Sequence, residues 1–288
     1  MIPKSGNRFS EKIVRQEKSG SMAAPTILVF DSGLGGLTVF REIAAARPDA
    51  NYIYIADDAA FPYGDMAEEA LITRIVHVIG KAIADHAPDL IAIACNTAST
   101  LALKELRARY TVPFVGTVPA VKPACALSAT KHIAVLGTQA TVSREYTRAL
   151  IREFAAGCKV MLVGSARLAA FAEAELVGAP ASDTDIAAEI APCFVDGERR
   201  TDTVVLACTH YPLLLSRFRS LARWPVTWLD PAPAIARRVV DLIGPPAGRT
   251  PATPARFIFT SGKLPPGVLA ETLIAYGFQG PALAKTAV

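Results

Sequence analysis

Two cysteines of this 288-residue chain occupy the same local sequence, 113 residues apart. Cys95 ends the segment DLIAIAC and is followed by Asn and Thr, while Cys208 ends the segment DTVVLAC and is followed by Thr and His. A free cysteine is most often a small buried hydrophobic residue. A pair repeated at the ends of two apolar segments instead favours a chemical role, because a thiolate accepts a proton and a thiol donates one.

The two thiols together indicate a particular reaction. A single base returns a proton mainly to the face from which it was taken, so inversion at a carbon needs two groups on opposite sides of the substrate. Each cysteine precedes a predicted helix, whose positive end favours the thiolate. We therefore expect a lowered pKa for both thiols, and racemisation without a cofactor as the chemistry.

The segments around the cysteines alternate between strand and helix patterns. Short apolar runs rich in β-branched residues predict strands at residues 26–30, 52–55, 90–94 and 112–115. Helical spacing of apolar residues separates these runs, and such alternation is typical of a mostly parallel sheet covered by helices. The pattern restarts with a predicted strand at residues 133–136.

The sequence therefore predicts an α/β fold with two pseudo-symmetric lobes. Each lobe is expected to be a mostly parallel sheet flanked by helices, with the active site in the cleft between them, because parallel sheets place ligands at the carboxyl ends of their strands. The last segment, from Asp230 onward, contains a predicted helix at 234–243 and a predicted strand at 256–259. We expect it to pack on the first lobe.

A glycine-rich turn, DSGLGG at residues 31–36, follows the first predicted strand. Its glycines let backbone N–H groups approach an anion closely, but the spacing lacks the third glycine of a dinucleotide fingerprint. Asp31 has two open interpretations: it caps the following helix, or it hydrogen-bonds a catalytic group and tunes the pKa of that group. Of the four histidines, His210 is the candidate for catalysis, because it stands two residues after Cys208.

Charge and composition exclude several classes of function. Residues 1–24 carry +3 of the net charge of +4, so the rest of the chain lacks the basic face that nucleic-acid binding requires. The cysteines show no metal-ligand spacing, and the uncharged stretch at 90–103 is too short and too polar to span a bilayer. Residues 1–24 are predicted to be a disordered tail without the apolar segment of a secretory signal, so the cytoplasm is the expected compartment.

Several motifs resemble, in the same order, those of the glutamate racemases of bacterial cell-wall synthesis, within the aspartate/glutamate racemase superfamily. They are DSGLGGLT at 31–38, PYG at 62–64, CNTAS at 95–99, Gly137-Thr138 with Thr141, and CTHYPL at 208–213. The resemblance covers nearly all of residues 26–262. It implies a first lobe of residues 26–118 plus 229–288, a second lobe of residues 119–228, and a reaction that needs neither pyridoxal phosphate nor a metal.

The resemblance also implies roles for individual residues. Cys95 is expected to take the proton from D-glutamate with help from Asp31, and Cys208 to take it from L-glutamate with help from His210. Glu173 is a further expected helper on the Cys208 side, although the segment around it departs from the family's pattern. The expected substrate contacts are Asp31, Ser32, Tyr63, Gly64, Asn96, Thr97, Thr138, Thr141, Thr209 and His210.

The same resemblance implies the biological setting. The D-glutamate product is expected to supply peptidoglycan synthesis, with glutamate as the small-molecule partner and a homodimer as the assembly. No nucleic-acid or membrane partner is expected.

Two other interpretations remain open. Two cysteines determine the proton transfer and not the side chain of the substrate. A racemase of the same superfamily acting on aspartate or another small carbanion precursor is therefore the nearest alternative. The other is a non-catalytic two-lobed protein that binds an acidic amino acid, or an interaction module, since some family members have been linked to inhibition of DNA gyrase. Replacing either cysteine by serine distinguishes them, because a racemase loses turnover and a binding protein loses little.

Overall fold

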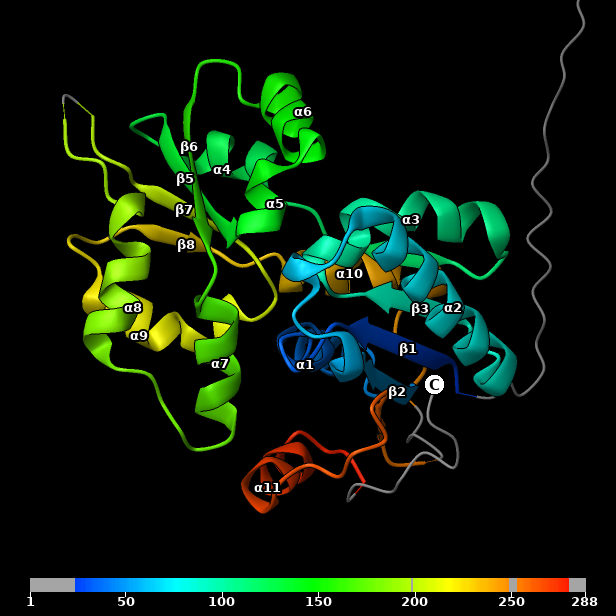
Figure 1. The fold of residues 1–288 in the computed structure, drawn as a ribbon. Helices are drawn as coiled ribbons and strands as arrows, with labels where there is room; N and C mark the ends of the chain where they lie inside the picture. The colour runs from blue at the N-terminus through cyan, green and yellow to red at the C-terminus, as the bar shows by residue number, and fades with distance from the viewer. Residues whose placement is uncertain (1–23, 198, 249–252, 280–288) are drawn as a thin grey trace, which may run out of the picture.

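The computed structural model describes residues 24–197, 199–248 and 253–279. The predicted disordered tail lies outside the described residues except for Ala24. The described chain forms two parallel β-sheets, each flanked by helices, and the two units lie side by side (Figure 1). We call the unit around the five-stranded sheet the first lobe and the unit around the four-stranded sheet the second lobe. The predicted two-lobed α/β architecture is confirmed.

The sheet of the first lobe has the strand order β4-β3-β1-β2-β9, and every pairing is parallel. Its strands are β1 (Thr26–Asp31), β2 (Asn51–Ala56), β3 (Leu90–Ile93), β4 (Phe114–Gly116) and β9 (Arg256–Phe259). Each residue of β1 from Ile27 to Phe30 is fully buried, as expected for a central strand with helices on both faces.

The sheet of the second lobe repeats this arrangement without the fifth strand, in the order β6-β5-β7-β8. Its strands are β5 (His132–Thr138), β6 (Lys159–Ser165), β7 (Thr203–Ala207) and β8 (Thr227–Leu229). β5 takes the central place of β1, and β7, which leads to Cys208, takes the place of β3, which leads to Cys95. The internal repeat in the sequence therefore corresponds to a repeat of topology.

The aspartates that begin the two cysteine segments, Asp89 and Asp202, make equivalent hydrogen bonds in the two lobes. The Asp89 carboxylate accepts the N–H of Thr26 at 2.8 Å, at the start of β1. The Asp202 carboxylate accepts the N–H of Thr130 at 2.8 Å and the hydroxyl of Ser128 at 2.6 Å, just before β5. Each aspartate thus holds the entry to the neighbouring central strand, which explains its place at the start of both cysteine segments.

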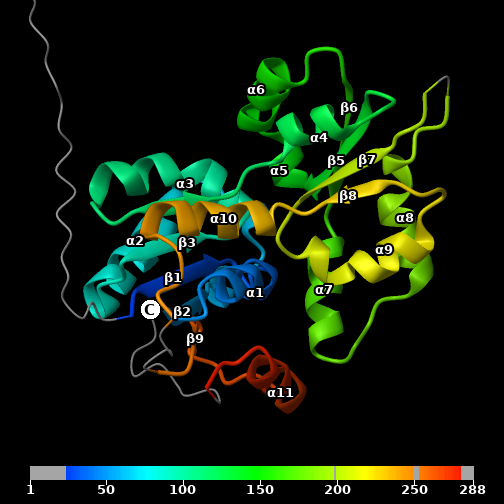
Figure 2. The ribbon, with the colours of Figure 1, turned by 180° about the vertical axis from the view of Figure 1, so that it is seen from behind.

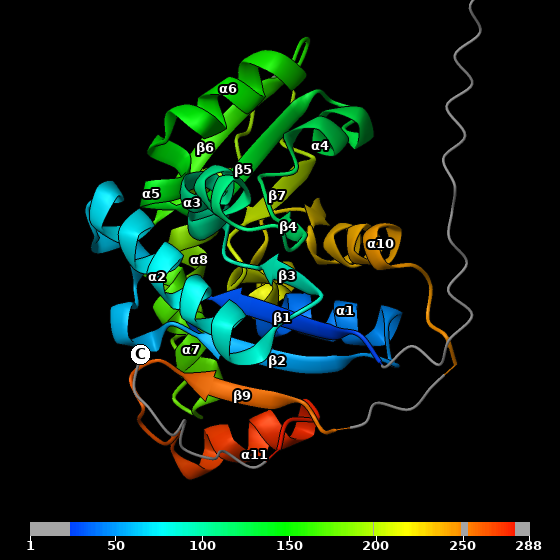
Figure 3. The ribbon, with the colours of Figure 1, turned by 90° about the vertical axis from the view of Figure 1, so that its right-hand side faces the viewer.

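Helices cover both faces of the first sheet. They are α1 (Leu37–Ala46), η1 (Asp58–Ala60), η2 (Tyr63–Asp65), α2 (Glu68–His86), α3 (Asn96–Arg109), α10 (Ala232–Ile243) and α11 (Gly267–Ala275). Apolar residues of α1, α10 and α11 pack on one face, and those of α2 and α3 pack on the other. Figure 2 shows α10 beside α1, and Figure 3 shows β9 at the edge of the sheet next to β2. The last segment does pack on the first lobe.

The second lobe is covered in the same way. Its helices are α4 (Val121–Leu127), α5 (Gln139–Ser143), α6 (Glu145–Phe154), α7 (Leu168–Leu176), α8 (Asp183–Ile190), η3 (Ala191–Cys193), η4 (Tyr211–Leu214) and α9 (Leu215–Leu221). Residues of α7, α8 and α9 share one apolar cluster, and residues of α4 and α6 share the cluster on the opposite face. No helix in the described part of the chain is long and apolar enough to cross a membrane.

Candidate active site

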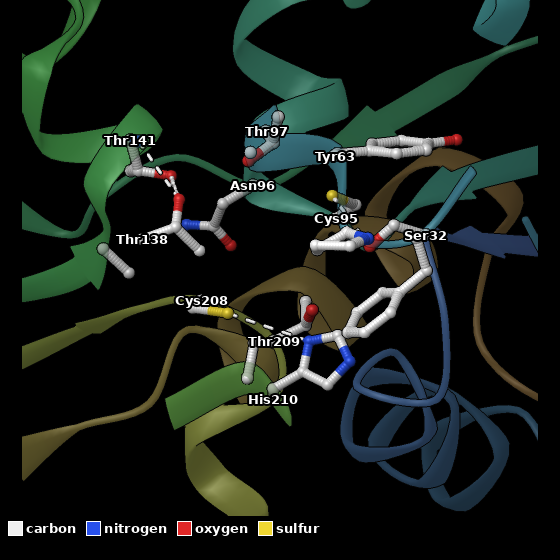
Figure 4. Close-up of a pocket in the computed structure, with 15 residues that line it drawn as sticks. Ser32, Tyr63, Cys95, Asn96, Thr97, Thr138, Thr141, Cys208, Thr209 and His210 are labelled. Carbon is white, nitrogen blue, oxygen red and sulfur yellow. Dashed lines mark hydrogen bonds between the residues drawn. The ribbon is translucent and has the colours of Figure 1, made fainter. Parts of the chain in front are cut away.

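A pocket lies between the two lobes, at the carboxyl ends of their strands (Figure 4). Most of the predicted site residues share its wall: Ser32, Tyr63, Gly64, Cys95, Asn96, Thr97, Thr138, Thr141, Cys208, Thr209 and His210. Asp31 and Glu173 lie behind this wall. The wall also contains four residues that were not predicted as site residues: Phe61, Pro62, Ala169 and Ala207. Pro62 belongs to the PYG motif, but the side chains of all four carry no reactive or polar group, so a search for chemistry did not select them.

Cys95 enters the pocket from the first lobe as the N-cap of α3 and is almost fully buried. Its sulfur accepts the N–H of Ala98 at 3.5 Å, and its thiol donates to the hydroxyl of Ser32 at 3.7 Å. Burial, reinforced by the nearby carboxylate of Asp31, raises the pKa of Cys95 to about 12. The expectation of a lowered pKa is wrong for this thiol, because removal from water outweighs the positive end of the helix.

Cys208 faces the pocket from the second lobe, with its sulfur 3.8 Å from Nδ1 of His210 (Figure 4). The other ring nitrogen, Nε2, lies 3.0 Å from Oε1 of Glu173. Burial disfavours the imidazolium, but the hydrogen bonds to Cys208 and Glu173 outweigh it and raise the pKa of His210 well above its usual value. The protonated ring places a positive charge next to the sulfur of Cys208. The expectation from the sequence for this thiol stays a prediction.

Asp31 ends β1 and is fully buried. Its Oδ1 accepts the N–H of Gly33 at 3.0 Å, and its Oδ2 accepts the hydroxyl of Thr209, from the other lobe, at 2.9 Å. The N-cap of α1 is Gly36, so the interpretation of Asp31 as a helix cap is wrong. Burial raises the pKa of Asp31, and its negative charge raises the pKa of Cys95 in turn. The hydrogen bonds of Asp31 go to Gly33 and Thr209, so it would tune Cys95 through its charge, and this role stays a prediction.

The glycine-rich turn after β1 does bind an anion, and that anion belongs to the protein. The N–H of Leu34 donates to Oε1 of Glu173 at 2.9 Å, across the boundary between the lobes. The ring of His210 also packs against this turn at Gly35. A Cβ at that position would lie 2.5 Å from Nδ1 of His210, so only glycine fits there. The turn therefore docks the first lobe against the Glu173–His210 pair.

Asn96 projects into the pocket between the two thiols (Figure 4). Both polar atoms of its amide are buried, and neither has a hydrogen-bond partner among the described residues. Buried amides are normally hydrogen-bonded, so these atoms are available to a ligand that carries both acceptors and donors. The hydroxyls of Thr138 and Thr141 lie 2.9 Å apart on the opposite wall. Within the described chain, no group of three or more His, Cys, Asp or Glu side chains could hold a metal ion.

Sequence reasoning also missed Asp57, which holds one wall of the pocket in place. Its buried carboxylate accepts the hydroxyls of Tyr63 and Thr260, both at 2.6 Å. It also accepts two hydrogen bonds from the guanidinium of Arg74, at 2.5 and 2.7 Å. These partners come from the η2 loop, from α2 and from the segment after β9. Only the folded structure brings them together, so no local pattern could have indicated the network.

Comparisons with known proteins identify the family to which the chain belongs. The family described as Asp/Glu/Hydantoin racemase matches residues 27–239. The chain is 56% identical over 219 residues to a glutamate racemase of Brucella ovis, covering 75% of this chain and 79% of the relative. Two solved structures are similar in fold. One is Escherichia coli glutamate racemase in complex with L-glutamate and the activator UDP-MurNAc-Ala, at a TM-score of 0.81 and 38% identity, covering 88% of this chain and 96% of that one.

The other is the glutamate racemase isoform RacE1 of Bacillus anthracis, at a TM-score of 0.79 and 25% identity, covering 93% of this chain and 100% of that one. The family match spans both cysteine segments and the strands of both sheets except β9. The chain therefore belongs to the Asp/Glu/hydantoin racemase family and, within that family, to the glutamate racemases.

Proposed function

We propose that this protein interconverts L- and D-glutamate by proton transfer between Cα and two cysteines. The observation that carries the proposal is that Cys95 and Cys208, one from each lobe, face the same pocket. Two thiols on opposite sides of one carbon are what inversion without a cofactor needs. The 56% identical relative named as a glutamate racemase supports glutamate as the substrate.

The proposed reaction of L-glutamate starts at Cys208, whose sulfur lies 3.8 Å from Nδ1 of His210. As the base, this sulfur removes the Cα proton of L-glutamate. The C–H bond breaks, an S–H bond forms at Cys208, and the electron pair stays on the substrate as a carbanion. Cys95, whose raised pKa keeps it protonated, then delivers its proton to the opposite face of Cα. The products are D-glutamate, a Cys208 thiol and a Cys95 thiolate.

The carbanion is stabilised by delocalisation into the α-carboxylate, so the pocket must bind that group. The first N–H groups of α3 lie beside Cys95 and form an anion site. Asn96 offers an unpartnered amide next to them, and the threonine hydroxyls of the second lobe offer further donors. The described wall contains no Lys or Arg side chain, so neutral donors, together with the His210 cation, would hold both carboxylates.

The wider setting is part of the same proposal. The D-glutamate made here would supply peptidoglycan synthesis in the cytoplasm, and the protein would work as a homodimer. The lobes would be residues 26–118 plus 229–288 and residues 119–228, which can separate to admit the substrate.

Circular dichroism in deuterated water, with no added cofactor, tests the proposal. Ellipticity should decay from L-glutamate and from D-glutamate to the same end point, with deuterium appearing at Cα. The same assay with aspartate determines the specificity. If neither amino acid changes, the chain is not a racemase of acidic amino acids, and calorimetry with glutamate then tests whether it is a binding protein.

A further inference from the structure

An arginine of the second lobe reaches across to the first lobe beside the pocket. Arg144 stands between α5 and α6, and its side chain is only 9% exposed. Its Nη1 donates to the carbonyl of Thr97 at 3.3 Å and to the hydroxyl of Thr100 at 3.2 Å, both on α3. Its Nε donates to Oε1 of Glu68 at 3.2 Å, at the start of α2. One guanidinium therefore ties the second lobe to two helices of the first.

Both ends of this connection adjoin the pocket. Thr97 is part of the wall contributed by the first lobe, and its carbonyl is one of the groups that Arg144 binds. On the other side, α5 carries Thr141, and Thr138 caps that helix; both line the opposite wall. Figure 1 shows α5 reaching from the second lobe towards α3. Arg144 thus sets the distance between the two walls.

The described arrangement of the lobes is closed. The space between the walls is narrow, about 30 Å³, which is room for about two water molecules. Separation of the lobes to widen this space would break the bonds of Arg144 to α3. A planar guanidinium with several donors suits this task, because it can bind a carbonyl, a hydroxyl and a carboxylate together.

We propose that Arg144 is a positioning residue that holds the two lobes closed over the substrate, so that both thiols reach Cα. The role in turnover rests on the proposed racemase function, whereas the effect on the distance between the lobes does not. The ion pair with Glu68 contributes little to holding the lobes together, because that carboxylate is largely exposed. The hydrogen bonds to Thr97 and Thr100 of α3 contribute most.

Kinetics of Arg144→Ala in both directions test the proposal. Loss of hydrogen bonds from a charged donor should raise KM about tenfold for both enantiomers, while kcat changes less, because saturating substrate still closes the lobes. Arg144→Lys should recover part of the change, since an ammonium can reach only some of the same acceptors. Arg148→Ala is the matched control: Arg148 is exposed on α6, one turn further along, and its variant should match the wild type.

Small-angle X-ray scattering supplies a readout that does not depend on activity. Without substrate, the R144A variant should have a larger radius of gyration than the wild type, and saturating glutamate should remove the difference. Thr100→Val removes an acceptor from the other lobe and should shift KM in the same direction, by less. A double variant should be no worse than R144A alone, because both changes break one contact.

The outcomes separate the two proposals. An unchanged KM and an unchanged radius of gyration in R144A would overturn the role of Arg144 while leaving the racemase intact. A fall in kcat at constant KM would also overturn it. If the wild type does not racemise glutamate, the proposed function fails, and the scattering comparison still decides whether Arg144 holds the lobes together.

Discussion

The imidazole of His210, in the wall of the pocket, and the carboxylate of Glu173, behind that wall, lie 3.0 Å apart, Nε2 to Oε1. Glu173 is also bound by the N–H of Leu34 from the other lobe, at 2.9 Å. The carboxylate thus fixes the orientation of the ring and favours its protonated form. On its far side the ring faces the sulfur of Cys208. We call this chain of contacts, from the Glu173 carboxylate through the His210 ring to the Cys208 sulfur, the relay.

This relay predicts how His210→Asn changes the pH dependence of turnover. The raised pKa of His210 keeps the ring charged at neutral pH, and the variant removes that cation. The sulfur of Cys208 then lacks the neighbouring positive charge, and a nearby cation is what favours a thiolate over a thiol. We expect kcat/KM at pH 7 to fall about 100-fold and the activity to recover partly as the pH rises. The measurement is a pH profile of kcat/KM for L-glutamate.

Glu173→Gln provides the graded comparison for this experiment. It keeps a hydrogen-bond acceptor for the ring and removes the negative charge, so its loss of activity should be smaller than that of H210N. If kcat/KM of H210N is lower by the same factor at every pH, and the profile does not shift towards higher pH, the relay is contradicted.

Alkylation rates should differ between the two candidate catalytic thiols. Cys95 and Cys208 are equally buried, 5% and 6% exposed, so access does not distinguish them. The pKa of Cys95 is raised to about 12, whereas Cys208 faces a cation. Because the thiolate is the nucleophile, iodoacetamide at pH 7 should modify Cys208 first. Site-resolved mass spectrometry over time measures both rates.

The Asp31→Asn variant sharpens this test. Removing the carboxylate removes one cause of the raised pKa of Cys95, so alkylation of Cys95 should accelerate while that of Cys208 changes little. Equal rates at the two thiols in the wild type would show that their protonation states do not differ as the structure indicates.

Serine variants of the two cysteines should show which cysteine acts on which face of the substrate Cα. Either substitution should lower racemisation by at least about 100-fold, because serine is a far weaker acid and base at neutral pH, while glutamate still binds. In Cys208→Ser, Cys95 remains on the D face, so D-glutamate should exchange its Cα proton with deuterated water and L-glutamate should not. Cys95→Ser should show the opposite preference. Proton NMR follows the Cα signal of each enantiomer.

The conservative variants Cys125→Ser and Cys193→Ser are controls for the cysteine experiment, because neither residue lines the pocket. Exchange of both enantiomers in either active-site variant would mean that one base serves both faces, and the two-cysteine mechanism would have to be abandoned.

Local pattern was enough to predict the elements that carry the chemistry. The predicted helix at 234–243 lies within α10 and the predicted strand at 256–259 coincides with β9, because turn residues bound both apolar segments. Cys95 and Cys208 were found from their repeated context, and the structure brings both to one pocket. These properties depend on neighbours in the chain, which a sequence displays directly.

Properties that depend on packing between distant segments could not be predicted. The pKa of Cys95 depends on how completely the packed residues around it remove it from water, and its helical position alone suggested the opposite sign. Asp57 lies outside the predicted strands, and its partner Thr260 follows β9, 203 residues further along the chain. No local pattern connects the two residues. Arg144 matters only because the lobes meet next to α3. In each case the partners are brought together by the fold and not by spacing.

A final prediction concerns the stability of the first lobe. Arg47 and Asp49 form a buried ion pair, with Nε 2.8 Å from Oδ1, and the same guanidinium donates to the carbonyls of Ile243 and Gly244 at the end of α10. Hydrogen bonding to Arg47 lowers the pKa of Asp49 to about 2. A folded pKa below the unfolded one stabilises the fold above that unfolded value, and the effect is lost as the pH falls towards 2.

We therefore expect Asp49→Asn to lower the free energy of unfolding at pH 7 by about 2 kcal/mol or more, because it also leaves the arginine buried without its counter-ion. Unfolding curves in guanidinium chloride at pH 7, 5 and 3 measure this free energy. The gap in the free energy of unfolding between variant and wild type should narrow between pH 5 and 3. Asp241→Asn is the control, since that carboxylate is exposed and lies 3.9 Å from Arg238. A gap that stays constant with pH would show that the charge of Asp49 does not stabilise the fold.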